Sequence, residues 1–327
     1  MIRWGFLGAG WIATRALAPA VAAADGAVLQ AVAARDPERA ARLGPAGATY
    51  PSYDELLADD TVDAVYISLT NDVHARWSIA ALRAGKHVLC EKPLGMTAAE
   101  VRAMTKVAAE SGRLLVEASW YRWHPRVRLA QDELRAGRIG PVRHVAAGFT
   151  FAGQLDGNYR LEEARGGGAL YDVGCYAISA ALWAFSGSPP RAVAARQQLG
   201  ATGVDLATEA VIDFDEGTAE IRAGISEPAR QWLVITGDGG EIELRDASYT
   251  SWRDDATELL VSDGATTQHL PVPAVDPYRV MVEEMSSVIA GGPGWLLPLS
   301  ESLATATVID AAFASARTGG APVPVLG

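Results

Sequence analysis

Residues 2–13 of the 327-residue chain read Ile-Arg-Trp-Gly-Phe-Leu-Gly-Ala-Gly-Trp-Ile-Ala. A short run with the character of a buried strand leads directly into a glycine-rich turn, and a helical pattern then continues to about Ala24. Strand, tight turn and helix in this order are the first half of a βαβ unit. The sequence therefore predicts a parallel sheet at its beginning.

The rest of the first third repeats this alternation of apolar runs and helical patterns. Asp36-Pro37 starts one helix with proline in its first turn, and Thr97 with Glu100 forms a capping-box pattern at the start of another. Strands that are apolar throughout indicate a parallel sheet with helices on both faces. We predict an α/β fold with a doubly wound (Rossmann) parallel sheet over residues 1–120. Its strands are expected at Ile2–Leu7, Val28–Ala33, Thr61–Ser68, His87–Cys90 and Leu114–Val116.

The periodicity changes after about residue 120. Two helical patterns and one strand come first, and consecutive strand-like runs then extend from Arg191 to about Val261 with turn residues such as Asp215-Glu216-Gly217 between them. This pattern predicts a C-terminal α+β domain over residues 121–327 with a large, mostly antiparallel open sheet. Helices are expected at Pro125–Gly137, Ala169–Ser186, Tyr278–Ala290 and Leu303–Ala316.

The composition argues against several classes of partner. The formal net charge is −11, so no basic excess is available to neutralise phosphates, and we expect no nucleic-acid partner. No apolar run approaches the roughly 20 residues that span a bilayer, so we expect no membrane segment. The first strand begins at Ile2, which leaves no room for a signal peptide, and Cys90 and Cys175 are the only cysteines. These features predict a cytoplasmic protein without a disulfide framework.

The glycine-rich turn has the form Gly8-x-Gly10-x-x-Ala13. In a dinucleotide-binding turn the first glycine permits the tight bend, the second lets the backbone approach a pyrophosphate, and a small third residue lets helix and strand pack closely. Trp11 and Ile12 belong to the same turn, where the new helix presents unpaired N–H groups to phosphate. A tight βα turn without a ligand is the simpler alternative, but the position inside a βαβ unit favours dinucleotide binding.

The end of the second strand bears on the choice of cofactor. An NAD enzyme usually has an acidic residue there for the ribose hydroxyls, whereas this chain reads Ala33-Ala34-Arg35-Asp36. Arg35 is suited to pair with a 2′-phosphate or to stack on adenine, although it could equally be a solvated arginine at a helix start. Asp36 is expected to cap the following helix. The sequence therefore favours NADP over NAD as the cofactor.

Two further motifs carry titratable groups. Glu91-Lys92-Pro93 follows a buried strand at its carboxyl end, where open α/β sheets bind ligands, and Lys92 is one of only three lysines. Downstream, Asp172 and Tyr176 follow Gly166-Gly167-Gly168 and lie four residues apart at a helix start, so they share one face. A tyrosine with a pKa near 10 transfers protons poorly at neutral pH, and a nearby ammonium lowers that pKa. Tyr176 is thus a candidate acid/base, with an amphipathic core residue as the alternative.

Together these motifs resemble the Gfo/Idh/MocA oxidoreductases. The resemblance rests on residues 8–13, on Glu91-Lys92-Pro93, and on the glycine run followed by Asp172-x-Gly174-x-Tyr176. Many members have histidine at position 176. With tyrosine there, this chain is similar to the branch of dimeric dihydrodiol dehydrogenase, NADP-dependent xylose dehydrogenase and glucose–fructose oxidoreductase. The likeness covers essentially the whole chain. It implies that residues 121–327 bind substrate and oligomerise, with the last helix packing back on the first domain.

The resemblance also implies roles for individual residues. Tyr176 would be the general acid/base on a substrate carbonyl or hydroxyl while hydride passes to or from nicotinamide C4. Lys92 would lower the pKa of Tyr176 and bind the reacting oxygen, and Asp172 would hold the geometry. Leu69, Asn71, His74 and Glu91 would line the nicotinamide half of the site. Trp120, Arg122 and Arg160 would reach substrate or nicotinamide, with plain packing as an equal alternative for each. The departure from the family pattern is Thr70, where proline usually precedes Asn71.

These expectations define a main function and its competitors. The main hypothesis is an NAD(P)-dependent dehydrogenase or reductase acting on a sugar, polyol or diol. A 3-ketoreductase for nucleotide-linked ketosugars is the alternative, for which Arg122, Arg126, Arg160 and Arg165 could form a diphosphate pocket. A glycosidase that uses bound NAD as a redox relay and a cofactor sensor without chemistry are the other two hypotheses.

His124, the spacing of the histidines and cysteines, and the C-terminal sheet each give one further expectation. His124 is expected to be a capping or core residue rather than a base, and the histidines and cysteines show no metal-ligand spacing, so no metal is expected. The broad C-terminal sheet has an apolar face that needs cover. We therefore expect a homodimer or homotetramer formed through that sheet.

Overall fold

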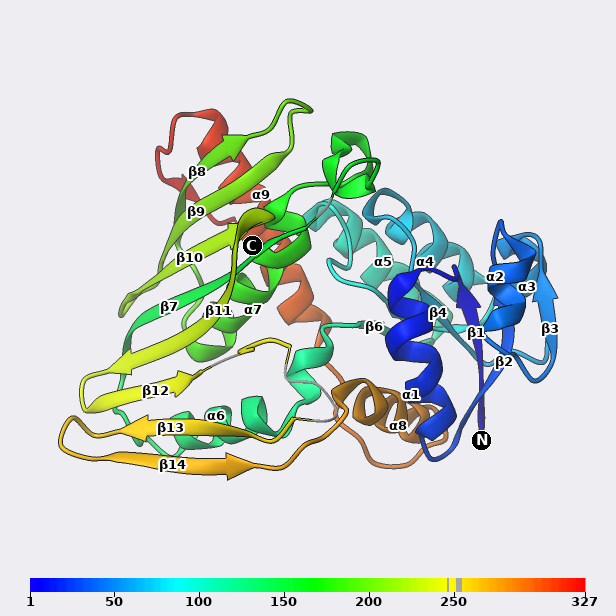
Figure 1. The fold of residues 1–327 in the computed structure, drawn as a ribbon, viewed down its shortest axis with the longest axis horizontal. Coiled ribbons are helices and arrows are strands. Elements are labelled where there is room, and N and C mark those ends of the chain that lie inside the picture. Colours follow the sequence, from blue (N-terminus) through cyan, green and yellow to red (C-terminus); the bar gives the residue numbers. More distant parts are fainter. Residues whose placement is uncertain (154, 246, 251–254, 327) are drawn as a thin grey trace. The chain divides into compact units, whose positions relative to one another are not determined.

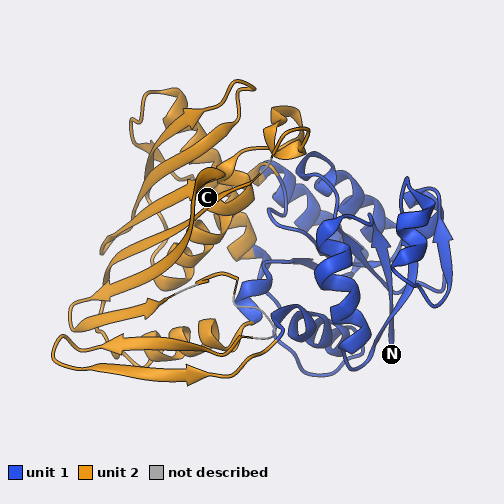
Figure 2. Cartoon of the chain, viewed as in Figure 1, with its two compact units in different colours: residues 1–95, 99–123, 276–299 blue, residues 96–98, 124–275, 300–327 orange. Residues whose placement is uncertain are grey.

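A computed structural model describes residues 1–153, 155–245, 247–250 and 255–326 of the chain. The chain forms two compact units, coloured separately in Figure 2. Unit 1 comprises residues 1–95, 99–123 and 276–299, and unit 2 comprises residues 96–98, 124–275 and 300–327. No helix in the described part of the chain is both long enough and apolar enough to span a bilayer.

Within the described residues, unit 1 contains a six-stranded sheet in which every neighbouring pair is parallel. The strand order is β3-β2-β1-β4-β5-β6, so the chain winds outward from β1 in both directions, and the predicted doubly wound sheet is confirmed. The strands are β1 (Ile2–Leu7), β2 (Ala27–Ala33), β3 (Ala48–Tyr50), β4 (Ala64–Ile67), β5 (His87–Cys90) and β6 (Leu115–Glu117). The helices between them are α1 (Ala18–Ala23), α2 (Pro37–Arg42), α3 (Tyr53–Leu57), α4 (His74–Arg83) and α5 (Ala98–Ser111).

The central strands form the core of unit 1. All four residues of β4 are buried, as are the last four of β1, which is the pattern of strands covered on both faces. Trp4 of β1 is fully buried, and its indole N–H donates to Ser286 Oγ at 3.1 Å. Ser286 lies in α8 (Pro277–Ile289), which packs beside α1 (Figure 1). This contact explains why residues 276–299 belong to unit 1.

The described part of unit 2 contains a nine-stranded sheet of order β14-β13-β12-β11-β7-β10-β9-β8-β15. Its pairs are antiparallel except for β7 and β10, which confirms the predicted mostly antiparallel sheet. The strands are β7 (Val142–Ala152), β8 (Ala192–Leu199), β9 (Asp205–Asp213), β10 (Thr218–Gly224), β11 (Ser226–Gly237), β12 (Gly240–Leu244), β13 (Thr257–Ser262), β14 (Thr267–Val272) and β15 (Val323–Pro324). The helices are α6 (Pro125–Arg135), α7 (Cys175–Ala184) and α9 (Leu299–Arg317).

One face of this sheet packs against α7. The helix is continuous with a preceding π-helical turn over Leu170–Gly174, and both contact β7 and β10. Gly174 allows the close approach, because a Cβ there would lie 3.2 Å from the Cβ of Ala223 in β10. Ala169, Val173, Ala223 and Ile225 form one buried cluster beneath the turn. The apolar run predicted as a helix thus lies against the centre of the sheet, and Asp172 and Tyr176 lie near its start.

Candidate active site

The glycine-rich turn begins where β1 ends. Gly8 has a φ of +102°, and a Cβ at this position would lie 2.8 Å from the carbonyl oxygen of Ser68, so both conformation and space require glycine. A Cβ at Gly10 would meet only the same carbonyl at 3.9 Å, which is ordinary contact. The backbone at Gly10 is therefore open on the side where a side chain would project. This open position at the start of a helix is suited to a pyrophosphate.

The residues that follow continue this helix start. Helix begins at Trp11, passes through a π-helical turn over Ala13–Leu17 and continues as α1. Ala13 is fully buried, as expected for the small residue that brings helix and strand together, whereas Trp11 is 67% exposed. The guanidinium of Arg15 lies 5.8 Å from the centre of the Trp11 ring. The motif thus combines a buried anchor with an exposed aromatic surface.

The predicted cofactor-selecting position lies between β2 and α2. Arg35 is exposed, and Asp36 is the N-cap of α2, accepting hydrogen bonds from the backbone N–H groups of Glu38 at 3.0 Å and Arg39 at 3.2 Å. The prediction that Asp36 caps this helix is confirmed. Because these bonds engage the Asp36 carboxylate, the guanidinium of Arg35 is the exposed charged group that immediately follows the strand.

Glu91 and Lys92 follow β5 at its carboxyl end. Glu91 is buried, and its carboxylate accepts a 2.6 Å hydrogen bond from the Tyr66 hydroxyl and a 3.3 Å bond from the backbone N–H of Lys92. Burial raises the pKa of Glu91, while the Lys92 ammonium and these hydrogen bonds act in the opposite direction. Lys92 is half-buried and is joined to Pro93 by a cis peptide bond. The pair is therefore held by neighbours rather than free in solvent.

His74 lies fully buried at the start of α4, within reach of two carbonyl oxygens. Its Nδ1 is 2.9 Å from the carbonyl oxygen of Pro93, and its Nε2 is 3.2 Å from that of Leu69. A neutral imidazole has one N–H and donates to only one of them. Burial lowers the pKa of His74, and the Lys92 ammonium acts in the same direction. His74 thus connects the Leu69 loop with the loop that carries Lys92, and Asn71 lies buried between Leu69 and His74 in the chain.

Packing contacts surround two of the predicted substrate residues. Trp120 is 3% exposed and stacks on Tyr278, with ring centres 4.7 Å apart. Arg122 is 2% exposed, and its guanidinium lies 5.6 Å from the centre of the Trp295 ring. These contacts give both residues a role in packing, and their contact with substrate stays a prediction.

His124 has the structural role that the sequence predicted. It is the N-cap of α6, and its Nδ1 accepts from the Arg126 backbone N–H at 3.1 Å. Burial, aided by the Arg126 charge, lowers the pKa of His124 to about 4, so its imidazole is neutral at physiological pH.

Unit 2 supplies Asp172 and Tyr176. Asp172 is buried and accepts a 2.6 Å hydrogen bond from Arg160 Nε, so these two candidate residues form an ion pair. Asp172 raises the pKa of Arg160, which keeps the guanidinium charged although burial opposes it. Tyr176 is 6% exposed, and its ring lies 5.8 Å from Phe149 and 5.9 Å from Tyr249, measured between ring centres. Two aromatic rings thus lie beside the Tyr176 ring, on the helix that also carries Asp172.

Three polar residues near these motifs were missed by the sequence analysis. Tyr66 holds the Glu91 carboxylate, Glu117 accepts from the Leu94 backbone N–H at 3.0 Å, and Asp205 accepts from the Leu170 backbone N–H at 2.8 Å. All three are buried. For Tyr66 and Glu117 the available signal was a single polar residue in the middle or at the end of an otherwise apolar strand, because burial of such a group requires a partner. Asp205 gave no such signal, because it begins β9, a strand that contains other polar residues.

Comparison with known protein families identifies the class. Residues 2–119 match the model of the oxidoreductase family GFO_IDH_MocA, described as an NAD-binding Rossmann fold, and residues 127–243 match the GFO/IDH/MocA C-terminal domain. The chain belongs to this family of oxidoreductases. It is therefore an NAD(P)-dependent enzyme acting on CH–OH groups, and the resemblance inferred from the motifs is confirmed.

Individual relatives cover nearly the full length. The D-xylose 1-dehydrogenase (NADP⁺) 2 of Haloferax volcanii is 36% identical over 97% of this chain and 98% of its own. A 3-ketoreductase from Actinomadura kijaniata, solved with NADP and TDP-benzene, superposes with a TM-score of 0.89 at 30% identity over 96% of this chain and 97% of that one. The aldose–aldose oxidoreductase of Caulobacter crescentus, solved with glycerol, superposes with a TM-score of 0.89 at 26% identity over 99% of both chains.

Gly8 and Gly10 of the glycine-rich turn are expected to respond differently to replacement by alanine. Gly10→Ala should leave the melting temperature unchanged, because its Cβ has room, but should raise the NADPH Kd about tenfold or more by filling the space where the pyrophosphate binds. Gly8→Ala should lower both stability and affinity, because its backbone conformation is strained with a side chain. Fluorescence titration and thermal denaturation measure the two effects. Wild-type affinity in Gly10→Ala would contradict the assignment of this turn.

Proposed function

We propose that this enzyme transfers hydride between nicotinamide C4 and a sugar, polyol or diol, with Tyr176 as the general acid/base. The observation that carries this proposal is the ion pair between Asp172 and Arg160, one helical turn before Tyr176. The Tyr176 ring itself packs beside Phe149. The relatives support the substrate class, because they are named as a xylose dehydrogenase and an aldose–aldose oxidoreductase.

The proposed roles follow from ordinary acid–base chemistry. The nicotinamide supplies the hydride acceptor or donor. During oxidation the substrate carbon loses a hydride and its hydroxyl loses a proton, so a base must take that proton, and Tyr176 is proposed for this step. Lys92 is proposed to act on the same substrate oxygen, because an ammonium lowers a phenol pKa and stabilises a developing oxyanion. During reduction the same phenol returns the proton.

Asp172 and Glu91 are proposed to support these groups without exchanging the substrate proton. Asp172 is held by Arg160, so its carboxylate fixes the first turn of the helix that carries Tyr176. Glu91 is held by Tyr66 and lies next to Lys92 in the chain, where its ionised form stabilises the Lys92 ammonium. The remaining cofactor-binding residues are proposed as the sequence predicted them: Gly8, Gly10, Trp11, Ile12, Ala13, Leu69, Asn71 and His74.

We propose NADP as the preferred cofactor, with Arg35 as the residue that selects it. The side chain is exposed and charged at the end of β2, and the neighbouring Asp36 is engaged in capping α2. A guanidinium forms two parallel hydrogen bonds to a phosphate, whereas NAD has only hydroxyl groups at that position of the ribose. The relatives support this choice, since NADP appears in the names of two of them.

Reduction of a nucleotide-linked ketosugar is the second candidate. The similarity to the ketoreductase solved with NADP and TDP-benzene favours it. Two of the four arginines proposed for a diphosphate pocket are buried in packing roles: Arg122 lies over Trp295, and Arg126 donates to the carbonyl oxygens of Arg245 and Ala247. Arg160 pairs with Asp172, and the exposed Arg165 pairs with Glu162 at 3.1 Å. The engagement of these arginines favours a substrate without a diphosphate.

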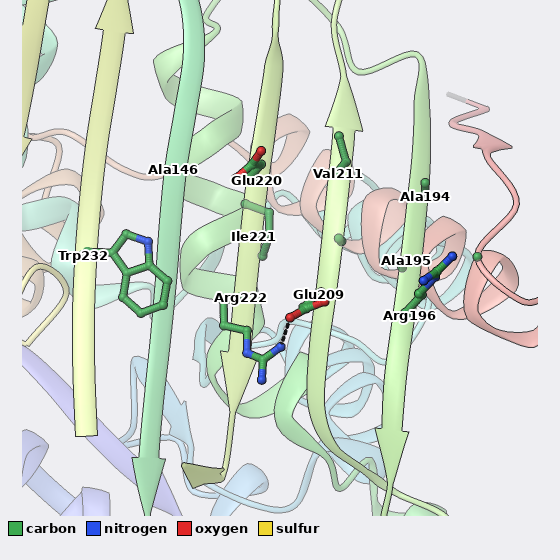
Figure 3. Close-up of a pocket in the computed structure, with 12 residues that line it drawn as sticks. Ala146, Ala194, Ala195, Arg196, Glu209, Val211, Glu220, Ile221, Arg222 and Trp232 are labelled. Atoms are coloured by element: carbon green, nitrogen blue, oxygen red, sulfur yellow. Dashed lines mark hydrogen bonds and ion pairs between the residues drawn. The ribbon is translucent and has the colours of Figure 1, made fainter. Parts of the chain in front are cut away.

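We propose a homodimer or homotetramer formed through the open face of the nine-stranded sheet. Figure 3 shows this face, where a groove of about 450 Å³ runs across β8, β9, β10, β7 and β11, in the order in which these strands lie in the sheet. Its floor has small and apolar side chains such as Ala146, Ala194 and Val211, with Trp232 lying flat across Gly148 at one side. Arg222 pairs with Glu209 in the middle. Arg196 and Glu220 also line the groove, so charges of both signs lie among the small apolar side chains. A surface of this mixed character is suited to self-association.

We also propose a cytoplasmic location. Neither Cys90 nor Cys175 forms a disulfide, and both are buried, as expected for thiols in a reducing compartment.

The catalytic proposal predicts two inactive variants that still bind cofactor. Tyr176→Phe and Lys92→Met should each lower kcat by at least about 1000-fold, since each removes a proton-transfer or charge-stabilising group, while the NADPH Kd changes less than about threefold. The assay is a spectrophotometric screen of NADP reduction with aldoses, polyols and diols, and of NADPH oxidation with ketosugars and their nucleotide-linked forms.

The control for this experiment is Lys106→Met, which removes an exposed lysine paired with Glu110 and should retain wild-type kcat. Loss of cofactor binding in both catalytic variants would contradict the assigned roles. Turnover restricted to nucleotide-linked ketosugars would favour the second candidate. Cofactor that stays bound and never exchanges with added NADPH would instead favour the NAD-dependent glycosidase.

The cofactor proposal predicts a change in preference on reversing one charge. Arg35→Asp should lower kcat/KM for NADP by about tenfold or more and raise it for NAD, because the carboxylate repels a 2′-phosphate and accepts from ribose hydroxyls. Arg42→Asp, at an exposed position of the same α2 segment, is the matched control and should leave the ratio unchanged. An unaltered ratio in Arg35→Asp would refute the phosphate contact.

The assembly proposal predicts that one added charge separates the subunits. Val211→Glu adds a carboxylate opposite Glu220 on the groove floor, so self-association should weaken and light scattering after gel filtration should report a monomer. Ala265→Glu, in the exposed turn between β13 and β14, should keep the wild-type mass. A wild-type protein that elutes only as a monomer would disprove the proposed assembly.

A further inference from the structure

A buried carboxylate from strand β9 accepts a hydrogen bond from the start of the helix that carries Asp172 and Tyr176. Asp205, the first residue of β9, is 2% exposed, and its Oδ2 accepts the backbone N–H of Leu170 at 2.8 Å. The same oxygen accepts the Thr208 hydroxyl at 2.6 Å. The amide of Leu170 is one of the unpaired donors at the helix start. Asp205 therefore acts as an N-cap supplied from 35 residues away in the chain.

The glycine run before the helix makes room for this carboxylate. Gly168 has a φ of +110°, and a Cβ there would lie 2.0 Å from Asp205 Oδ1. A Cβ at Gly167 would lie 2.5 Å from the carbonyl oxygen of Arg160. The two glycines thus permit close packing against Asp205 on one side and against the Arg160 segment on the other. These two contacts explain why positions 167 and 168 require glycine.

Hydrogen bonds connect the Arg160 segment and the glycine run to Asp172. The backbone N–H of Gly168 donates to the Arg160 carbonyl at 2.9 Å, and the N–H of Asp172 donates to the Gly168 carbonyl at 3.1 Å. The Arg160 side chain closes the ring by donating to Asp172 at 2.6 Å. Arg160 therefore holds the carboxylate of Asp172, while Asp205 holds the backbone from which Asp172 and Tyr176 project.

We propose that Asp205 is a positioning residue for the reaction: its ionised carboxylate holds the first turn of the Tyr176 helix and so orients Asp172 and Tyr176. This inference rests on the proposed function of those two residues and goes beyond it, because Asp205 itself touches neither substrate nor cofactor in this proposal. A small displacement of a reacting group lowers catalytic rate strongly even when binding is unaffected. The expected consequence is a loss of kcat.

The ionisation of Asp205 gives the proposal a distinctive signature. Burial raises the pKa of Asp205 to about 6, and the hydrogen bonds from Thr208 and the backbone of Leu170 and Ala169 oppose this rise. Charged groups on the flanking segments are the Arg160–Asp172 pair and Glu163, whose carboxylate lies against Gly203. Above about pH 6 the carboxylate is ionised and accepts the helix amide. Below that pH it is protonated and one acceptor oxygen becomes a donor, so kcat should fall.

Three substitutions separate an effect on positioning from an effect on folding. Asp205→Asn imitates the protonated acid, so kcat at pH 7.5 should fall about 10- to 100-fold and stay nearly flat from pH 5 to 8. Thr208→Val removes a hydrogen bond to the ionised form, which raises the pKa of Asp205 and should move the acid limb of kcat to higher pH by about half a unit or more. Thr208→Ser restores the hydroxyl and should restore the wild-type limb.

The measurements are kcat from pH 5 to 8, the NADPH Kd and the melting temperature. The NADPH Kd should stay within about twofold in all three variants, because the glycine-rich turn belongs to unit 1. Asp213→Asn, at the other end of β9, is the matched control and should keep wild-type kcat. Should Asp205→Asn fail to fold, the Thr208 pair alone decides the question.

The outcomes distinguish this inference from the function on which it rests. Wild-type kcat in Asp205→Asn, or an acid limb that does not move in Thr208→Val, overturns the positioning role of Asp205. Retained turnover in Tyr176→Phe instead overturns the proposed catalytic function. A lower melting temperature with an unchanged kcat profile would assign Asp205 to stability alone and also overturns the proposal.

Discussion

A buried carboxylate must be hydrogen-bonded or paired, and this constraint organises the proposed catalytic motifs of both units. In unit 1, Glu91 is held by the Tyr66 hydroxyl and lies beside Lys92 at the end of β5. In unit 2, Asp172 is paired with Arg160, and Asp205 accepts the backbone N–H of Leu170 at the start of the Tyr176 helix. Each carboxylate fixes the position of a neighbouring chemical group because losing its partner would leave a buried charge unsatisfied.

The same constraint gives other charged or titratable residues near these motifs a structural role. Arg126 is fully buried and donates to the carbonyl oxygens of Arg245 and Ala247, so its guanidinium supports the chain beyond β12. His124 caps α6 through Nδ1, and its low pKa keeps it neutral. A charged or titratable residue near a catalytic motif is therefore informative only once its partners are known.

Much of the fold could be predicted because local patterns and long-range burial agree. The apolar strands β1, β2 and β5 were anticipated to within one residue at each end, since a strand buried on both faces has an unmistakable composition. The strand β4 is shorter than the expected Thr61–Ser68. The strands β3, β14 and β15 were not predicted, for two different reasons. β3 and β15 are too short to show a period, and β14 is mostly exposed and polar, so its pairing with β13 carries no hydrophobic signal.

By itself the sequence determined the glycine-rich turn, the Glu91-Lys92 motif and the spacing of Asp172 and Tyr176, because each depends on residues close together in the chain. Only the tertiary structure decided what holds them: Tyr66 on Glu91, Arg160 on Asp172, and Asp205 on the helix start. The last of these partners comes from a strand 35 residues away from the amide that it caps. Such partners leave no local pattern, since a hydrogen bond across the fold constrains the positions of two side chains in space and not their spacing in sequence.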